Sequence, residues 1–278
     1  MNKQAEKLNS LLKKNSPYVY ELLSDSGREA FFPKHGIIAQ TSEAKNATIN
    51  ATIGQAFDDN NSPMVLKVFS EQIKLPLNSL LYSPSHGQIE LRKLWQRLIF
   101  EKNPSLNHRI TLPVVTNGLT HGLFLVSKLF VDNDTAIVLP DKFWGNYKLV
   151  FSNGRFVHYK CFDGNGFNVN GLKEKLFEQD TKKVVLLNFP NNPTGYSVTD
   201  EEAEQVVAVI KNCAKQNSVV VICDDAYFGL FYEENTYKES LFAKLSALDN
   251  VLAVKVDGIT KEAYAWGLRV GFVTYGFK

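Results

Sequence analysis

The sequence predicts an α/β fold, in which a mainly parallel, seven-stranded sheet carries helices on both faces. Two observations support this prediction. From about residue 112 onward, short β-branched runs alternate with helical patterns, which is typical of a parallel sheet with crossover helices. Most of these runs are continuously apolar, which indicates strands that are buried on both sides.

Seven runs are the candidate strands. In chain order they are Leu112–Thr116, Ala136–Leu139, Arg155–Tyr159, Val184–Leu187, Val219–Cys223, Leu252–Val256 and Val270–Thr274. The clearest helix, Asp200–Gln216, lies between the fourth and fifth runs. Thr199 and Glu202 have the spacing of a capping box, and apolar residues recur on one face, so we interpret this helix as a packing element.

The first hundred residues have a different pattern. They contain an amphipathic, lysine-rich start and a predicted helix near Gln88–Phe100. The segment Asn103–Asn107, which contains Pro104, is the best candidate boundary before the sheet begins. The sequence therefore predicts two parts, residues 1–105 and 106–278.

Composition excludes several classes of function. The 278 residues include 31 basic and 29 acidic side chains, and this balance gives no electrostatic case for a nucleic acid or an anionic membrane as partner. No run approaches the ~18 apolar residues of a spanning helix, and the opening is polar, so we expect a cytoplasmic protein. Three cysteines without Cys-x-x-Cys spacing and five histidines without a ligand pattern support neither disulfides nor a metal site.

Three motifs follow successive strands and carry the chemistry. The turn Asn188-Phe-Pro-Asn-Asn-Pro-Thr-Gly195 follows a buried strand, at the end where open α/β sheets bind ligands. The next strand ends in Asp224-Asp-Ala-Tyr227, and the one after it leads to Lys261, with Arg269 eight residues later in Gly-Leu-Arg-Val-Gly. Taken singly, these are an ordinary turn, a helix cap and a solvated lysine. Their order and spacing favour a site.

This ordered set resembles the fold-type I pyridoxal-phosphate enzymes and, within them, the class I/II aminotransferases. The resemblance extends from about Ile49 to the end of the sequence. It implies that residues 106–278 form the large domain that binds pyridoxal 5'-phosphate. It also implies that residues 1–105 contribute to a partial small domain and to dimer contacts.

The resemblance assigns roles to the central residues. Lys261 would form the Schiff base with the cofactor aldehyde and carry a proton to and from the substrate. Asp224 would pair with the pyridine nitrogen and keep it protonated. Tyr227 and Asn192 would hydrogen-bond the phenolic oxygen of the ring, and Asn192 would also face the substrate.

The phosphate is expected at the start of a helix. Gly118, Leu119 and Thr120 follow the first strand in Thr-Asn-Gly-Leu-Thr and resemble the phosphate turn of the family, with Arg269 as the cation. Trp144, in Phe-Trp-Gly-Asn-Tyr after the second strand, resembles the tryptophan that stacks on the ring in the aspartate aminotransferase branch. It could equally be a core aromatic, and its place after a strand favours stacking.

Two earlier positions also match the family. Tyr82, in Tyr-Ser-Pro-Ser-His-Gly, resembles the tyrosine that reaches the phosphate of the neighbouring subunit, which implies a homodimer with shared active sites. Gly54, in Ile-Asn-Ala-Thr-Ile-Gly, resembles a glycine near the substrate carboxylate, although a plain turn glycine fits as well.

The sequence departs from the family at two places. Gly258 stands where the family usually has a serine whose hydroxyl binds the phosphate, and we expect Thr260 to compensate only in part. Family members also continue beyond Gly-x-Arg-x-Gly into a second part of the small domain, with an arginine for the substrate carboxylate. The sequence ends at Lys278, so we expect either a fragment of a longer protein or a natural remnant.

The leading hypothesis is an aminotransferase that moves an α-amino group between an amino acid and a 2-oxo acid. Two alternatives stay open: a lyase on the same scaffold, and a non-catalytic remnant. The sequence does not predict which amino acid is the substrate.

Overall fold

The computed structural model describes residues 2–31, 40, 41, 43–52, 54–72, 74 and 81–278, and the chain divides into two compact units, Met1–Gly54 and Gln55–Lys278. The first unit contains α1 (Lys3–Asn15), α2 (Pro17–Leu22), α3 (Asp25–Glu29) and the 3₁₀ turn η1 (Ala44–Asn46). α1 begins where the Asn2 side chain accepts a hydrogen bond from the Gln4 backbone N–H.

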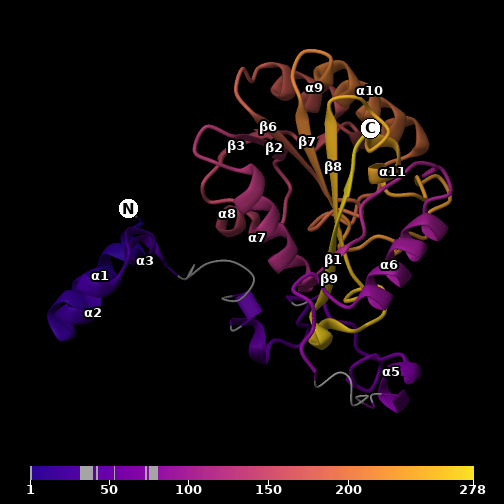
Figure 1. The fold of residues 1–278 in the computed structure, drawn as a ribbon. Helices are drawn as coiled ribbons and strands as arrows, with labels where there is room; N and C mark the ends of the chain where they lie inside the picture. The colour runs from indigo at the N-terminus through magenta and orange to yellow at the C-terminus, as the bar shows by residue number, and fades with distance from the viewer. Residues whose placement is uncertain (1, 32–39, 42, 53, 73, 75–80) are drawn as a thin grey trace. The chain divides into compact units, whose positions relative to one another are not determined.

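The second unit is built around the seven-stranded sheet (Figure 1). Its strands are β1 (Val114–Asn117), β2 (Ala136–Pro140), β3 (Arg155–Tyr159), β6 (Lys183–Leu187), β7 (Val219–Asp224), β8 (Val251–Asp257) and β9 (Val270–Gly276). They are ordered β1-β9-β8-β7-β6-β2-β3. β9 is antiparallel to both neighbours and the other pairs are parallel, so the predicted mainly parallel sheet is confirmed.

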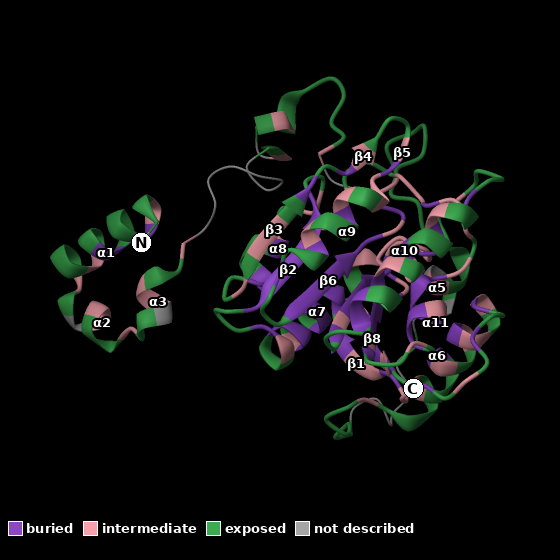
Figure 2. Cartoon of the chain, turned by 90° about the horizontal axis from the view of Figure 1, so that it is seen from above, coloured by how far each residue is buried: buried purple, intermediate pink, exposed green. Residues whose placement is uncertain are grey.

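Helices cover both faces of this sheet, as the sequence predicts (Figure 2). α6 (Ile89–Lys102), α9 (Val169–Phe177), α10 (Asp200–Ala214) and α11 (Leu241–Leu245) pack on one face. α7 (Gly118–Phe130) and α8 (Tyr147–Val150) pack on the other. The described residues of this unit also contain α5 (Lys67–Gln72), the hairpin of β4 (Phe162–Asp163) and β5 (Gly166–Phe167), and η3 (Trp266–Leu268).

α10 begins at the capping box that the sequence predicts. The Thr199 hydroxyl accepts a hydrogen bond from the Glu202 N–H, and the Glu202 carboxylate accepts one from the Thr199 N–H, which completes the predicted capping box. Its apolar stripe, which includes Val206 and Ile210, is fully buried against the sheet and α9. α10 is therefore a packing element.

The described residues contain no helix with the length and apolar character needed to cross a bilayer. Cys161, Cys213 and Cys223 are buried and carry free thiols. Within the described ranges, no group of histidine, cysteine and acidic side chains could hold a metal ion.

Candidate active site

One edge of the sheet collects the predicted motifs. Asp224 ends β7, Asn192 lies in the turn after β6, and Lys261 follows β8 by four residues. β6, β7 and β8 are parallel, so their carboxyl ends lie at the same edge. β1 runs in the same direction as β8, because both are antiparallel to β9 between them, and the start of α7 therefore reaches this edge as well.

A cavity of about 250 Å³ opens at this edge. Eight residues predicted from the sequence line it, namely Leu119, Thr120, Trp144, Asn192, Asp224, Tyr227, Lys261 and Arg269. Leu123, Tyr147, Asn188, Ala226 and Thr260 complete the lining. The volume lies just under the about 300–1,000 Å³ typical of small-molecule sites. The structure thus brings these residues together, while their individual roles stay predictions.

Asp224 is the buried acid of the cavity. Only 4% of its surface is exposed, and burial raises its pKa to about 6. Two hydrogen bonds oppose this rise: the Tyr147 hydroxyl donates to Oδ2 over 2.5 Å, and the Ala226 N–H donates to Oδ1 over 3.2 Å. Burial in turn raises the pKa of Tyr147 well above its usual value, so its hydroxyl keeps its proton and remains a donor.

Lys261 supplies an amine with altered basicity. Burial lowers its pKa, the Asp224 carboxylate opposes this change, and the Arg269 guanidinium adds to it. The amine lies 5.4 Å from the centre of the Tyr227 ring. The Tyr227 hydroxyl in turn accepts a weak hydrogen bond of 3.4 Å from the Asn192 side-chain amide.

The start of α7 and the side chain of Arg269 meet at the other end of the cavity. Gly118 has a φ of 77°, and a Cβ placed on it would come within 2.7 Å of Arg269 Nη2, so only glycine allows this approach. Arg269 itself adopts left-handed backbone angles, with φ 52° and ψ 45°. A non-glycine residue rarely adopts this conformation, which concentrates at functional sites.

The position of the missing serine is sterically closed. A Cβ on Gly258 would lie 2.6 Å from the Val270 carbonyl oxygen and 3.0 Å from the Leu119 side chain. Thr260, two residues later, is 1% exposed and lines the cavity, and its hydroxyl has no hydrogen-bond partner among the described residues. An unpartnered buried hydroxyl is costly, which indicates that Thr260 meets a polar group when a ligand is bound.

Three further residues predicted from the sequence differ in where they lie relative to the cavity. Trp144 lies in the cavity wall with its ring edge-on to Tyr147, the centroids 5.4 Å apart. Tyr82 is fully exposed and does not line the cavity, and Gly54 belongs to the first compact unit. The predicted roles of Tyr82 and Gly54 therefore stay predictions.

Sequence reasoning missed two side chains that orient Asp224. Tyr147 is buried and bonds its carboxylate, and the signal for it in the sequence is its position three residues after Trp144, in the turn that leads into α8. The Asn188 amide donates to the Asp224 carbonyl oxygen over 2.7 Å, and its Oδ1 accepts from the Asn192 N–H over 2.7 Å. Asn188 lies in the predicted turn motif, so its position was known but not its role.

A protein-family model described as aminotransferase class I and II matches residues 48–276. The chain belongs to this family. Members of the family depend on pyridoxal phosphate.

Relatives of known name agree with this assignment. An aspartate aminotransferase of Bacillus subtilis is 23% identical over 193 residues, which cover 69% of this chain and 47% of that protein. A probable aspartate/prephenate aminotransferase of Rickettsia conorii is 24% identical over 249 residues, 86% of this chain and 59% of that one. The chain therefore spans about half the length of the curated relatives it matches.

Solved structures show the same fold. An aminotransferase from Anaerococcus prevotii superposes with a TM-score of 0.79 at 24% identity, covering 92% of this chain and 67% of that one. The fold-type I architecture predicted from the sequence is thereby confirmed.

The cavity fits the cofactor of the family. Asp224 offers a carboxylate for a protonated ring nitrogen, and Lys261 offers an amine for an aldehyde. Arg269 and the first N–H groups of α7 offer a cation and hydrogen-bond donors for a phosphate, and the unpartnered hydroxyl of Thr260 adds a further donor.

Proposed function

We propose that this chain binds pyridoxal phosphate and carries the cofactor site of an aminotransferase, which moves an α-amino group between an amino acid and a 2-oxo acid. One observation carries the proposal. Residues from five separate segments, all of them expected at the site from the sequence, line one cavity with an acid, an amine and a cation among them.

Asp224 and Lys261 perform the proton chemistry in this proposal. Bound pyridoxal phosphate supplies a ring that accepts the electron pair released at the amino acid Cα. The Asp224 carboxylate holds a proton at the ring nitrogen, and the Tyr147 hydroxyl and the Ala226 N–H hold that carboxylate in place. The lowered pKa of Lys261 leaves more of its amine uncharged, and the uncharged amine is the form that accepts the Cα proton.

The remaining cavity residues bind and orient. Arg269, the start of α7 at Gly118–Thr120 and the Thr260 hydroxyl hold the phosphate. Tyr227 and Asn192 hydrogen-bond the ring oxygen, and Trp144 covers a face of the ring, which excludes water from it.

The proposal includes a homodimer with shared sites, in which Tyr82 reaches the partner's phosphate. The complete exposure of this tyrosine in the single chain supports that role. Residues 1–105 would contribute to the small domain and the dimer contacts, with Gly54 and Asn192 near the substrate. A cytoplasmic location stays a prediction.

The cofactor site is tested by visible absorbance. The purified chain is mixed with pyridoxal phosphate, and Lys261→Ala is compared with Lys142→Ala, a half-exposed lysine near the same sheet edge whose ion pair is with its neighbour Asp141. We expect a visible band of lysine-bound cofactor in the parent and in Lys142→Ala but not in Lys261→Ala. A band that survives in Lys261→Ala would contradict the assignment of the lysine.

Product analysis then tests the reaction. Amino-group transfer requires a 2-oxo acid acceptor, whereas a lyase releases its product without one. Dependence on the acceptor would support the proposal, and ammonia formation without it would contradict it. A chain that binds cofactor and turns over no amino acid would be the non-catalytic remnant.

A further inference from the structure

A buried ion cluster lies behind the candidate site, on the opposite face of the sheet. Along β8, Val254 and Val256 pack with α7, and Ala253 packs with the helices of the other face. Lys255 lies between the two valines, so its side chain points away from the cavity toward α6. It is 1% exposed.

The Lys255 ammonium is surrounded by acids and an aromatic ring. It hydrogen-bonds Asp225 Oδ2, lies 3.4 Å from Asp257 Oδ2 and lies 4.4 Å from the centre of the Phe228 ring. Both carboxylates are nearly as buried, at 6% and 5% exposure. One lysine thus joins the ends of two strands.

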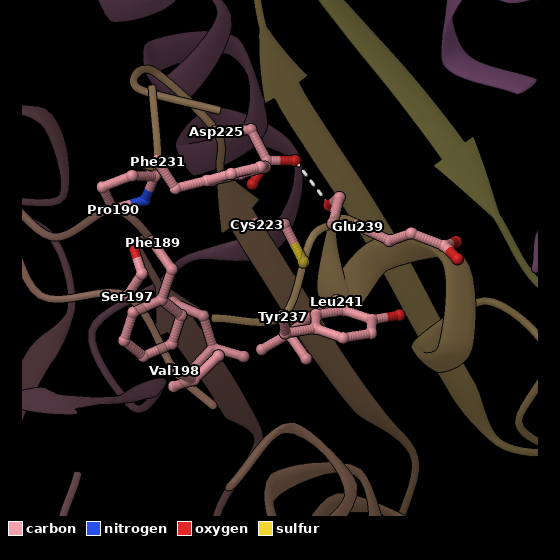
Figure 3. Close-up of a pocket in the computed structure, with 12 residues that line it drawn as sticks. Phe189, Pro190, Ser197, Val198, Cys223, Asp225, Phe231, Tyr237, Glu239 and Leu241 are labelled. Atoms are coloured by element: carbon pink, nitrogen blue, oxygen red, sulfur yellow. Dashed lines mark hydrogen bonds between the residues drawn. The ribbon is translucent and has the colours of Figure 1, made fainter. Parts of the chain in front are cut away.

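Each carboxylate is also held by a second donor. The Ser240 hydroxyl donates to Asp225 Oδ2 over 2.6 Å, the bond drawn dashed in Figure 3. Trp95 of α6 donates its indole N–H to Asp257 Oδ1 over 2.9 Å. The cluster is therefore fixed on both sides and is not a loose pair.

The place of this cluster in the chain links it to the site. Asp225 directly follows Asp224, and Asp257 is the last residue of β8, directly before the loop that carries Lys261. The Asp225 N–H also donates to the Val256 carbonyl oxygen over 2.9 Å, so backbone and side chains join the same two loops. Asp225 and Asp257 adjoin the segments that carry Asp224 and Lys261, so a shift of either residue would displace the acid or the amine.

Stability alone does not explain an ion cluster of this kind. Buried ion pairs carry a large desolvation cost, and well-packed apolar residues of similar volume usually stabilise a fold as well or better. Fixed geometry is what the apolar alternative lacks, because apolar contacts have no direction.

We propose that Lys255 is a positioning residue, which holds Asp225 and Asp257 together and thereby fixes Asp224 relative to Lys261. The role in positioning Asp224 and Lys261 rests on the proposed function. The joining of the two loops by Lys255 does not, because it requires no cofactor.

Hydrogen exchange of the cofactor-free chain tests the joining directly. Lys255→Met keeps the length of the side chain and removes its charge. The triple variant Lys255→Met/Asp225→Asn/Asp257→Asn leaves no unpaired charge, so it remains testable if the single variant does not fold. The matched control is Lys183→Met, which removes another buried lysine at the amino end of β6.

We expect exchange to become about tenfold faster in residues 224–228 and 257–263 of the Lys255 variants, because local opening of these loops would cost about 1.4 kcal/mol less. β2 and β3 should keep the parent rate, and Lys183→Met should leave both loops unchanged. Parent rates in both loops would overturn the proposal. So would a uniform increase along the chain, because that result would indicate a role in stability only.

A second measurement connects the cluster to the site. With pyridoxal phosphate added, the Lys255 variants should bind with a Kd about tenfold higher and with weaker visible circular dichroism per bound cofactor. Unchanged affinity and dichroism alongside loosened loops would overturn the role in positioning. If the parent chain binds no cofactor, the proposed function is refuted. Hydrogen exchange of the cofactor-free chain would still test whether Lys255 joins the two loops.

Discussion

Asp224→Asn should stabilise the cofactor-free chain at neutral pH, and this gain should shrink as the pH falls toward 3.8. Burial raises the pKa of Asp224 from 3.8 to about 6, so the folded state holds this proton more tightly than the unfolded state. The stability contributed by the protonated acid is complete below pH 3.8 and is lost as pH rises through about 6. Asparagine has a similar shape and no charge, so it avoids this loss.

The two pKa values set the size of the effect. The linkage relation gives a difference in free energy of unfolding of about 1 kcal/mol at pH 4.5 and about 3 kcal/mol at pH 7.5, with Asp224→Asn the more stable. The Tyr147 hydroxyl can still donate to the asparagine oxygen, whereas the Ala226 N–H then faces the asparagine amide and loses its acceptor. This loss is the same at both pH values, so the test is the change of about 2 kcal/mol between them.

Urea unfolding of both cofactor-free proteins at pH 4.5 and pH 7.5 measures these differences. The control is Asp132→Asn, which removes an exposed carboxylate and should show no comparable gain in the free energy of unfolding at pH 7.5. An equal difference between parent and Asp224→Asn at both pH values would refute the assignment of a raised pKa to this acid. The same variant should bind pyridoxal phosphate more weakly, because it cannot hold the ring-nitrogen proton by charge.

Two further predictions concern the phosphate end of the cavity. Thr260→Val should raise the Kd for pyridoxal phosphate about tenfold, which corresponds to the free energy of one hydrogen bond to a charged group. The Kd for pyridoxal, which has no phosphate, should stay unchanged. Thr274→Val removes another buried, unpartnered hydroxyl outside the cavity and should change neither constant, and equal losses in the two variants would contradict the role of Thr260. Gly258→Ser should lower the free energy of unfolding by about 1–3 kcal/mol in a urea titration, because its Cβ would lie 2.6 Å from the Val270 carbonyl oxygen. Full stability together with tighter cofactor binding would show that a serine can be accommodated there.

Local patterns predicted most of the fold, because the strands that build it are apolar on both sides. The bounds of β3 agree with the prediction, and the other six strands differ from it by one or two residues at their ends. The antiparallel insertion of β9 between β1 and β8 was not predicted, because strand order depends on long-range pairing. Turn residues after strands located the candidate site for a general reason, since parallel strands bring their carboxyl ends to one edge.

The missed residues share a different property, which is that their partners are distant in the chain. Tyr147 bonds Asp224 across 77 positions, and Lys255 lies within an apolar strand whose pattern gives no sign of its acidic neighbours. Gly258 is a departure from the family that the sequence already displays, but only the structure explains it, because its position has no room for a side chain.

The polar groups that suit the site for a ligand also lower the stability of the cofactor-free chain. At neutral pH it keeps the Asp224 charge buried, and the Thr260 hydroxyl has no hydrogen-bond partner in the part of the chain that the structure describes. A ring nitrogen that shares its proton with Asp224 would remove the first cost, and a phosphate oxygen at Thr260 would remove the second. Both groups therefore make the folded chain more dependent on its cofactor, and the ion cluster around Lys255 resists the local rearrangement that would otherwise relieve the cost by opening the loops.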